Sequence, residues 1–480
     1  MAIEMQKKMT IFDDQNTMEN GYDKQIFDED GHQKRTGTLL TATAHVITAV
    51  IGAGVLSLAW AIAQLGWIAG PIILMTISFI TLYCSTLLTD CYRTPDPITG
   101  KRNRTYMEAV KVNLGGTKYK LCGIAQYGFL VAIAVGYTVT ASTSLTALKR
   151  SHCFHKNGHN AHCHEPNYPY MIGFAVVQIL LSQIPNFHNL SGLSILAAIM
   201  SFAYALIGLV LAGSRILGGE NNSITTLTGV VIGVDVTAVG KVWRVFQSLG
   251  NIAASYFYST VLIEIQDTLK SSPPENKVMK KATTIGVVIT TMFYMLCGCV
   301  GYAAFGNDAP GNFLTGFRVY EPYWLIDMGN ICIVVHLLGA YQVFCQPLFS
   351  FVEEFSFSRW PQSEFVTKEN RVNIPLCGVY NINYFKLVWR TAYVAVTSLF
   401  AMIFPFFNEF VGFIGAMSFW PLTVYFPVEM YLAQSKTPRL SSKWIFLKML
   451  SWACFVISVV AAVGSIQGLI QNVTKYKAFS

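Results

Sequence analysis

The sequence predicts an all-α membrane protein whose chain crosses the bilayer many times. Of its 480 residues, 53% are hydrophobic and only 12% are charged, and the mean hydropathy is +0.43. Soluble proteins carry about 25% charged residues. The apolar residues form long runs over most of the chain, and these runs have the length that a helix needs to span a membrane.

Eleven apolar segments alternate with polar ones. They are expected at residues 38–60, 66–90, 120–147, 168–185, 190–213, 243–267, 282–304, 323–352, 384–404, 409–433 and 445–470. Residues 1–35 hold eight acidic and five basic residues and almost no apolar cluster, which is typical of a disordered tail. The expected parts are therefore this tail, a transmembrane domain at 36–470 and a short tail at 471–480.

The basic residues indicate the orientation of the spans. With eleven spans, 25 of the 34 Lys and Arg fall on the side of the N-terminus and nine on the other side. Basic residues concentrate on the cytoplasmic side of membrane proteins. We therefore expect a cytoplasmic N-terminus and an extracellular C-terminus.

The same distribution argues against several other classes of protein. The net charge is +8, and the basic residues lie between the apolar runs. Membrane topology therefore explains this charge better than nucleic-acid binding does. No P-loop, catalytic triad or glycine-rich phosphate cradle is found in the sequence. We expect neither catalysis nor a cofactor.

The first span contains a break in the middle of the membrane. Within TLLTATAHVITAVIGAGVLSLAW, Gly52 and Gly54 flank Ala53. Glycine weakens a helix, and backbone groups freed inside a bilayer are tolerated only where they line a cavity. A ligand site is one interpretation, and a small-residue surface for helix packing is the other.

A second breakable segment lies five spans later. The sixth span contains Gly250-Asn251, then Ala253-Ala254-Ser255, and then the aromatic run Tyr256-Phe257-Tyr258. Interruptions at matching positions of two five-span halves are the sequence sign of an inverted-repeat transporter. The pair of breaks favours a ligand site, because a packing glycine has no reason to recur at that interval.

Several long motifs resemble the plant amino acid permeases, in the amino acid/auxin permease branch of the amino acid–polyamine–organocation superfamily. They are AHVITAVIGAGVLSLAWAIAQLGWIAGP, GYTVTAS, SYFYSTVLIEIQDTL, HLLGAYQVFCQP and GFIGAMSFWPLTVYFPVEMY, and the resemblance extends from Arg35 to the end of the chain. It implies a LeuT-like fold of five plus five inverted spans with discontinuous spans 1 and 6 and an eleventh helix. It also implies proton-coupled import of amino acids across a plant plasma membrane.

Such a substrate is a zwitterion, and the two breaks offer a partner for each charge. Free amides at a helix start suit the carboxylate, and we expect them from Ile51, Gly52, Ala53 and Gly54. We expect the break of span 6 near Asn251, Ala254 and Ser255, where its carbonyls suit the ammonium group. Tyr137, Thr138 and Phe257 are candidates to line the side-chain pocket, although each could equally be an ordinary core residue.

Proton coupling requires a group that titrates within the membrane, where ionisable residues are rare. The candidates are His45, His336 and Glu264. Each histidine could also be a hydrogen-bonded core residue, and Glu264 could belong to an inner gate.

The segment SHCFHKNGHNAHCHEP carries five of the nine histidines around Cys153 and Cys163. The topology places it outside, where disulfides persist, so a Cys153–Cys163 bridge is expected, with metal binding by the histidines as the alternative. Asn221 and Asn472 begin sequons on the same side and are candidates for glycosylation.

Two other functions fit the same sequence. A related carrier would move another substrate, such as an auxin-like indole acid. A transceptor of the same fold would sense the substrate without transporting it. In each case the partners are a small molecule and the lipid bilayer.

Overall fold

The computed structural model describes residues 35–158, 163, 165–184, 191–218, 223–317, 322–374 and 378–474. The predicted tail 1–35 lies outside these residues except for Arg35, and so does most of the predicted tail 471–480. Both predictions therefore stay predictions.

The first half of the molecule is helical apart from one small hairpin. Its elements are α2 (Leu39–Val50), the 3-10 helix η1 (Ala53–Ser57), α3 (Leu58–Asp90), β1 (Arg93–Thr94), β2 (Lys101–Arg102), α4 (Tyr106–Leu114), α5 (Gly116–Asn157), α6 (Tyr168–Ser182) and α7 (Ser191–Leu217).

The second half is also helical apart from one hairpin. Its elements are α8 (Ala238–Ser255), α9 (Ser259–Asp267), α10 (Glu275–Phe305), the 3-10 helices η3 (Gly306–Asp308) and η4 (Phe313–Phe317), α11 (Tyr323–Arg359), α12 (Glu364–Thr367), β3 (Glu369–Ile374), β4 (Gly378–Asn383), α13 (Tyr384–Ile403), α14 (Phe407–Ser418), the π-helical η5 (Phe419–Tyr425), α15 (Phe426–Gln434) and α16 (Ser442–Val473). Within each hairpin the strands are antiparallel.

Each of the eleven predicted spans corresponds to one or more of these helices. Eight helical segments of the described chain are long and apolar enough to cross a membrane, and the others are shorter or interrupted. Span 1 consists of α2, η1 and the start of α3, and span 6 consists of α8 and α9. The two discontinuous spans are thus the first and the sixth, as predicted.

The predicted end of span 1 at Trp60 was too early. The helix continues to Leu65, and the turn into span 2 occurs at Gly66, whose φ of 78° is in the left-handed region. A Cβ atom at Gly66 would also meet the backbone of Leu227 and Gly229. Glycine is therefore required at this turn for two reasons, its backbone conformation and the close packing around it.

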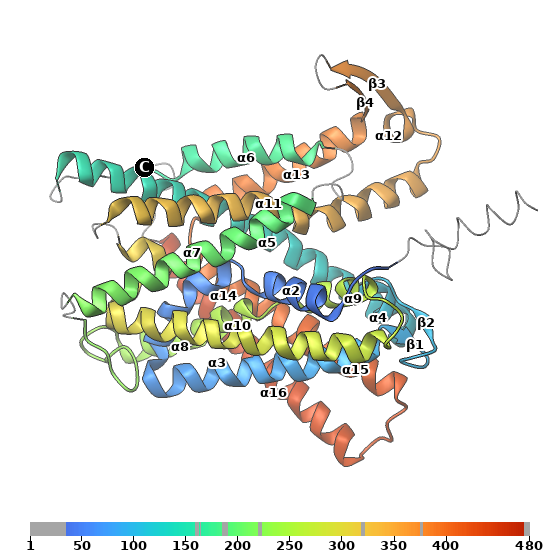
Figure 1. Cartoon of the computed structure of the whole chain (residues 1–480), viewed down its shortest axis with the longest axis horizontal. Helices are drawn as coiled ribbons and strands as arrows, with labels where there is room; N and C mark the ends of the chain where they lie inside the picture. The colour runs from blue at the N-terminus through green and yellow to red at the C-terminus, as the bar shows by residue number, and fades with distance from the viewer. Residues whose placement is uncertain are drawn as a thin grey trace, which may run out of the picture.

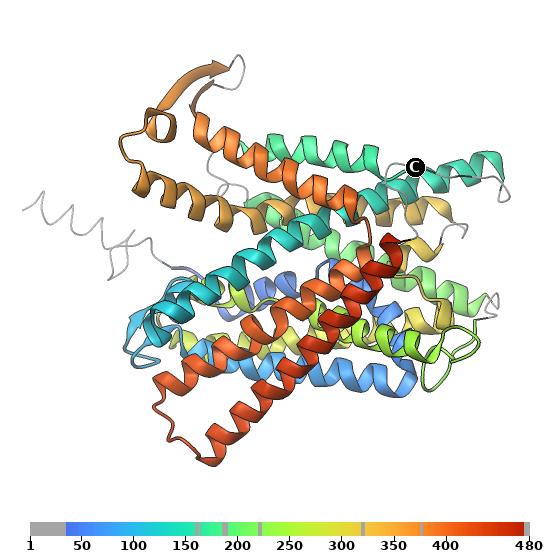
Figure 2. The ribbon, with the colours of Figure 1, turned by 180° about the vertical axis from the view of Figure 1, so that it is seen from behind.

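The helices form two groups, which lie one above the other in Figure 1. Helix α11 packs on α5 and α7, whereas α10 packs on α3 and α2, and α8 packs on α14 and α16. Seen from behind, α16 runs across the outside of the lower group (Figure 2). The broken segments of spans 1 and 6 lie in the interior, enclosed by these helices.

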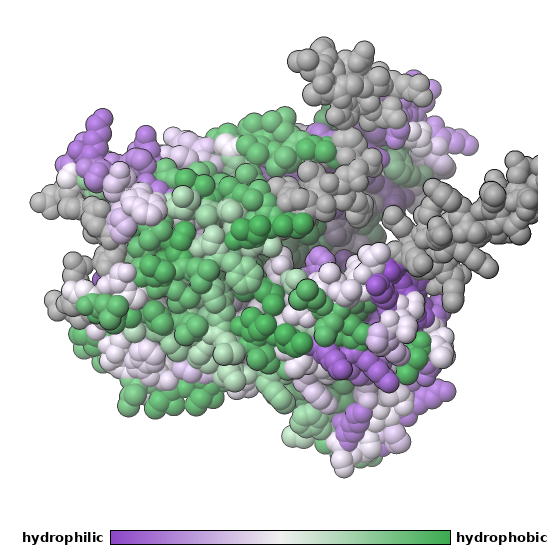
Figure 3. All heavy atoms as spheres, viewed as in Figure 1, coloured by the Kyte–Doolittle hydropathy of each residue, from purple (hydrophilic) through white to green (hydrophobic). Residues whose placement is uncertain are grey.

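The surface has the pattern of a protein embedded in a bilayer. A broad hydrophobic band crosses the middle of the molecule, and hydrophilic residues gather at its two ends (Figure 3). Many large apolar side chains are exposed; those of Ile72, Phe79, Leu180 and Met292 are each more than half exposed. In water such exposure would be costly, whereas in lipid it is favourable. The chain is therefore a multi-pass membrane protein.

Candidate substrate site at two helix breaks

The first break follows Val50, the last residue of α2. Ile51 and Gly52 have extended backbone conformations, and the 3-10 helix η1 starts at Ala53. The N–H of Ile51 still donates to the carbonyl of Ile47 at 2.8 Å, so Ile51 offers no free amide, contrary to the prediction. Within the described residues, the N–H groups of Ala53 and Gly54 have no backbone partner. They stand at a helix start, which favours an anion.

The second break lies later in the chain than predicted. Helix α8 continues through Ser255, and the non-helical residues are Tyr256, Phe257 and Tyr258. Asn251, Ala254 and Ser255 thus belong to the last turns of α8. The Ala254 carbonyl accepts from the N–H of Phe257 at 3.3 Å, and the Asn251 carbonyl accepts from the Ser255 hydroxyl at 3.0 Å. The break was therefore predicted one turn too early, and among the three predicted residues only the Ser255 carbonyl, at the very end of the helix, lacks a partner on its own helix.

Hydroxyl groups anchor the second break to neighbouring helices. Tyr256 donates to the Thr291 hydroxyl at 3.1 Å, and Tyr258 donates to the Ser85 hydroxyl at 2.8 Å. Both tyrosines are fully buried. The break therefore has a defined shape, set by side chains from α3 and α10.

The two breaks are in direct contact. A Cβ atom at Gly54 would lie 2.8 Å from the Cα atom of Ser255 and 2.9 Å from its hydroxyl oxygen. At Gly52, by contrast, a Cβ atom would meet nothing within 4 Å. The two glycines that looked equivalent in sequence thus differ: Gly54 allows close packing of the breaks, and Gly52 borders open space.

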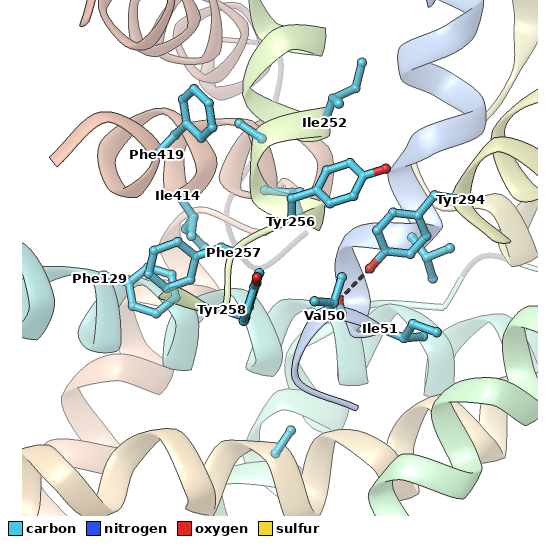
Figure 4. Close-up of a cluster of buried hydrophobic side chains, with 14 of the residues drawn as sticks. Val50, Ile51, Phe129, Ile252, Tyr256, Phe257, Tyr258, Tyr294, Ile414 and Phe419 are labelled. Carbon is cyan, nitrogen blue, oxygen red and sulfur yellow. Dashed lines mark hydrogen bonds between the residues drawn. The ribbon is translucent and has the colours of Figure 1, made fainter. Parts of the chain in front are cut away.

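A buried tyrosine from α10 joins the carbonyl ends of the two breaks. The Tyr294 hydroxyl lies 2.5 Å from the carbonyl oxygen of Val50 and 3.0 Å from that of Ser255. Figure 4 shows its ring beside Tyr256, with the bond to Val50 drawn. The carbonyl ends of both half-helices thus converge on one point, beside the open space at Gly52.

An aromatic group extends from the second break to α5 and α11. Phe257 packs on Phe129 with ring centroids 4.1 Å apart (Figure 4), and Phe344 contacts both Phe129 and Tyr137 at about 6 Å. These rings form an apolar wall near the breaks. Sequence analysis missed Phe129 and Phe344, although Phe129 is eight residues before Tyr137 on the same helix and Phe344 lies in the HLLGAYQVFCQP motif.

Two other predicted residues have structural partners. The Thr138 hydroxyl donates to the Ala134 carbonyl of its own helix at 3.0 Å. The Asn251 side chain donates to the Asn408 side chain at 2.6 Å and so joins α8 to α14. Thr138 and Asn251 are both fully buried, which fits packing roles close to the site.

The ionisable candidates differ in exposure: one is buried and two are exposed. His336 on α11 is buried and its Nδ1 atom lies 2.8 Å from the Ala197 carbonyl of α7. His45 on α2 is exposed. Glu264 on α9 is also exposed, and within the described residues its carboxylate has no hydrogen bond or ion pair.

At the end of the molecule where α2 begins, ion pairs tie three segments together. Glu275 accepts from Arg35 at 2.8 Å and from Arg93 at 2.7 Å, and its side chain is 2% exposed. Close by, Tyr92 donates to Asp267 at 2.6 Å. Hydrogen bonds to Glu275 raise the pKa of the Arg93 guanidinium, and burial raises the pKa of the Tyr92 phenol. Both groups therefore keep their ordinary protonation states.

At the opposite end, Cys153 and Cys163 form a disulfide. Beside it, His152 pairs with Asp327 at 2.9 Å. No cluster of three metal-binding side chains occurs among the residues that the structure describes, but His159, His162 and His164 lie outside these residues, so metal binding by this segment stays an untested alternative.

Of the two glycosylation candidates, only Asn472 lies within the described residues. Asn472 lies in the last turn of α16, where its amide donates to Glu409 at 2.8 Å, and a glycan on that nitrogen would disrupt this bond. Asn221 lies outside the described residues.

Comparison with known proteins adds to this geometry. Residues 35–471 match the model of the family described as transmembrane amino acid transporter protein. This chain belongs to that family. It is 63% identical to amino acid permease 6 of Arabidopsis thaliana, over 99% of each chain, and 62% identical to amino acid permease 1 of the same plant, over 94% of this chain and 93% of the relative.

The fold is shared with a solved structure of low sequence similarity. The crystal structure of MhsT in complex with L-phenylalanine matches with a TM-score of 0.54 at 10% identity, over 90% of this chain and all of that one. At this identity the match supports the fold alone. This member of the transmembrane amino acid transporter family thus has a LeuT-like, all-α fold, and it transports amino acids.

Proposed function

We propose that this transporter is a proton-coupled symporter that imports amino acids across the plasma membrane by alternating access. The observation that carries the proposal is the contact between the two breaks. The amides of Ala53 and Gly54 have no backbone partner among the described residues, Gly52 borders open space, and the helix-end carbonyls of Val50 and Ser255 both lie within 3.0 Å of the Tyr294 hydroxyl. This pairing suits a carboxylate and an ammonium group carried by one small molecule.

The same geometry favours an amino acid over an indole acid. An indole acid has a carboxylate but no ammonium group, so it would leave the converging carbonyl ends of α2 and α8 without a cation. The partial negative charge of the two helix C-termini would then be compensated by the Tyr294 hydroxyl alone. The transceptor alternative remains distinct, because it would bind the amino acid without moving it.

The first experiment measures uptake by cells that express this chain and lack their own amino acid carriers. Radiolabelled neutral amino acids should accumulate, faster at acidic external pH, and a protonophore should abolish the accumulation. Indole-3-acetic acid in excess should not compete. Binding of the amino acid without uptake would support the transceptor. Accumulation that depends on neither the external pH nor the protonophore would contradict proton coupling.

The driving force is the proton gradient, and no cofactor is invoked. His336, His45 and Glu264 are the candidates for the coupling proton. We favour a histidine, because imidazole titrates between the pH values of an acidic exterior and a neutral cytoplasm. His336 also joins α7 to α11 through Ala197, so a change in its charge would affect the contact between two helices.

Substitution by glutamine distinguishes these candidates. His336→Gln or His45→Gln should flatten the dependence of uptake on external pH more than it changes the KM of the amino acid, because glutamine keeps hydrogen bonding and removes titration. Currents measured over a range of external pH test this. If both variants keep the parental curve while Glu264→Gln flattens it, the proton is carried by Glu264.

A further inference from the structure

The Tyr294 hydroxyl contacts the last carbonyl of each half-helix at the two breaks. The Val50 carbonyl ends α2 and the Ser255 carbonyl ends α8. At the end of α8, the carbonyls of Ala253 and Ala254 accept from the backbone of the following residues, whereas the Ser255 carbonyl faces the phenol. One hydroxyl thus lies within hydrogen-bond distance of acceptors from two half-helices that are far apart in sequence.

The phenol has only one proton for these two acceptors. Each carbonyl belongs to a helix C-terminus, which carries about half a negative charge. A single neutral hydroxyl compensates this charge only in part, so the point where the helix ends meet still favours a cation. The ammonium group of an amino acid has three N–H donors and a positive charge, which suits such a point.

The position of the hydroxyl is held by burial of the ring and by its contact with Tyr256. Tyr294 is fully buried, and its ring makes an edge-on contact with Tyr256 at 5.2 Å. Tyr256 is itself held by its bond to Thr291, one turn before Tyr294 on α10. The phenol therefore cannot swing away without disturbing the second break.

We propose that Tyr294 is a positioning residue for the ammonium end of the substrate site. Its hydroxyl holds the carbonyl ends of α2 and α8 at the separation at which both can accept from one ammonium group. This inference rests on amino acid transport at the two breaks, as proposed above. Tyr294 belongs to α10, which is a continuous helix. In this proposal α10 therefore fixes the geometry of the two broken spans, 1 and 6.

The test removes one oxygen atom, in Tyr294→Phe. Tyr302→Phe is the matched control, because Tyr302 is also fully buried on α10 and its hydroxyl donates to Asn307 at 3.0 Å, two turns away from the breaks. For Tyr294→Phe the KM of neutral amino acid uptake should rise about tenfold or more, the scale expected when buried carbonyls lose a hydrogen bond. Tyr302→Phe should keep the parental KM. The amount of each protein at the cell surface is measured in parallel.

Three results would overturn the proposal. They are a KM for Tyr294→Phe within twofold of the parent, an equal rise in both variants, or a loss confined to the maximal rate. If Tyr294→Phe does not reach the surface, the shift in Tm that an amino acid induces is compared among the three purified proteins, and equal shifts overturn the proposal. Failure of the parent chain to take up any amino acid would instead refute the proposed function.

Discussion

At the scale of single residues, two glycines in one motif have different roles. Gly54 packs against Ser255 so closely that a Cβ atom would overlap its neighbour, whereas the space beside Gly52 is empty. The backbone of Gly52 is extended, with φ of −136°, which any residue adopts. Neither the backbone conformation nor the packing among the described residues requires glycine at position 52, whereas the proposed substrate site does.

This difference predicts opposite outcomes for the two alanine substitutions. Gly52→Ala should keep the parental Tm and raise the KM of uptake, because its methyl group enters the open space. Gly54→Ala should lower stability by about 1–3 kcal/mol, because the methyl group forces the breaks apart. Thermal unfolding of purified protein and uptake kinetics check the pair. A Gly52→Ala protein with unchanged KM would mean that the substrate carboxylate binds elsewhere.

At the scale of elements, the segment before α2 is held against the start of α10. Gly37 forms backbone hydrogen bonds with Thr268 and Lys270, and Glu275 is the shared partner of Arg35 and Arg93. The carboxylate is almost fully buried between two cations. Removing one partner from a buried ionic group is far more costly than removing it from an exposed pair, because charge is left without compensation.

Glu275→Ala should therefore lower the free energy of unfolding by about 3–5 kcal/mol, the range for a broken buried pair. Glu364→Ala is the control, since Glu364 pairs with Lys368 on the surface and its side chain is 82% exposed. That variant should change stability by less than about 0.5 kcal/mol. Thermal unfolding in the same detergent measures both, and similar Tm values for the two variants would contradict the structural role of Glu275.

At the scale of the whole molecule, the described chain begins and ends at opposite ends of the helix bundle. Arg35 lies beside the end of α3 and the start of α10, and α16 ends beside the start of α14, at the other end (Figures 1 and 2). An odd number of membrane crossings places the two ends of a chain on opposite sides. The odd count agrees with the uneven distribution of Lys and Arg along the sequence.

We therefore predict that tags on the two termini are accessible from different sides of the membrane. In intact cells a protease should remove a C-terminal tag and leave an N-terminal tag, and permeabilised cells should lose both. Removal of both tags from intact cells would mean that one of the eleven segments does not cross. Removal of the N-terminal tag alone would reverse the orientation.

Much of this architecture follows from local sequence. Bilayer thickness and the cost of unpaired backbone groups act on each segment separately, so the positions of the apolar spans and the weakness at Gly52 to Gly54 are visible along the chain. Besides the amide of Ile51, which is bonded to Ile47, the errors lie at helix boundaries, as at Trp60 and Ser255. There the helix end depends on a contact with another segment, such as the close approach of Gly66 to Leu227.

The sequence by itself determined that this is a broken-helix membrane carrier, and which two spans are broken. Only the tertiary structure decided how the breaks meet: that Gly54 touches Ser255, that Phe129 and Phe344 flank Phe257, and that Tyr294 joins the two carbonyl ends. The reason is that these contacts join residues far apart in the chain. Their partners are set by how helices pack, and each residue read alone is compatible with an ordinary place in the core.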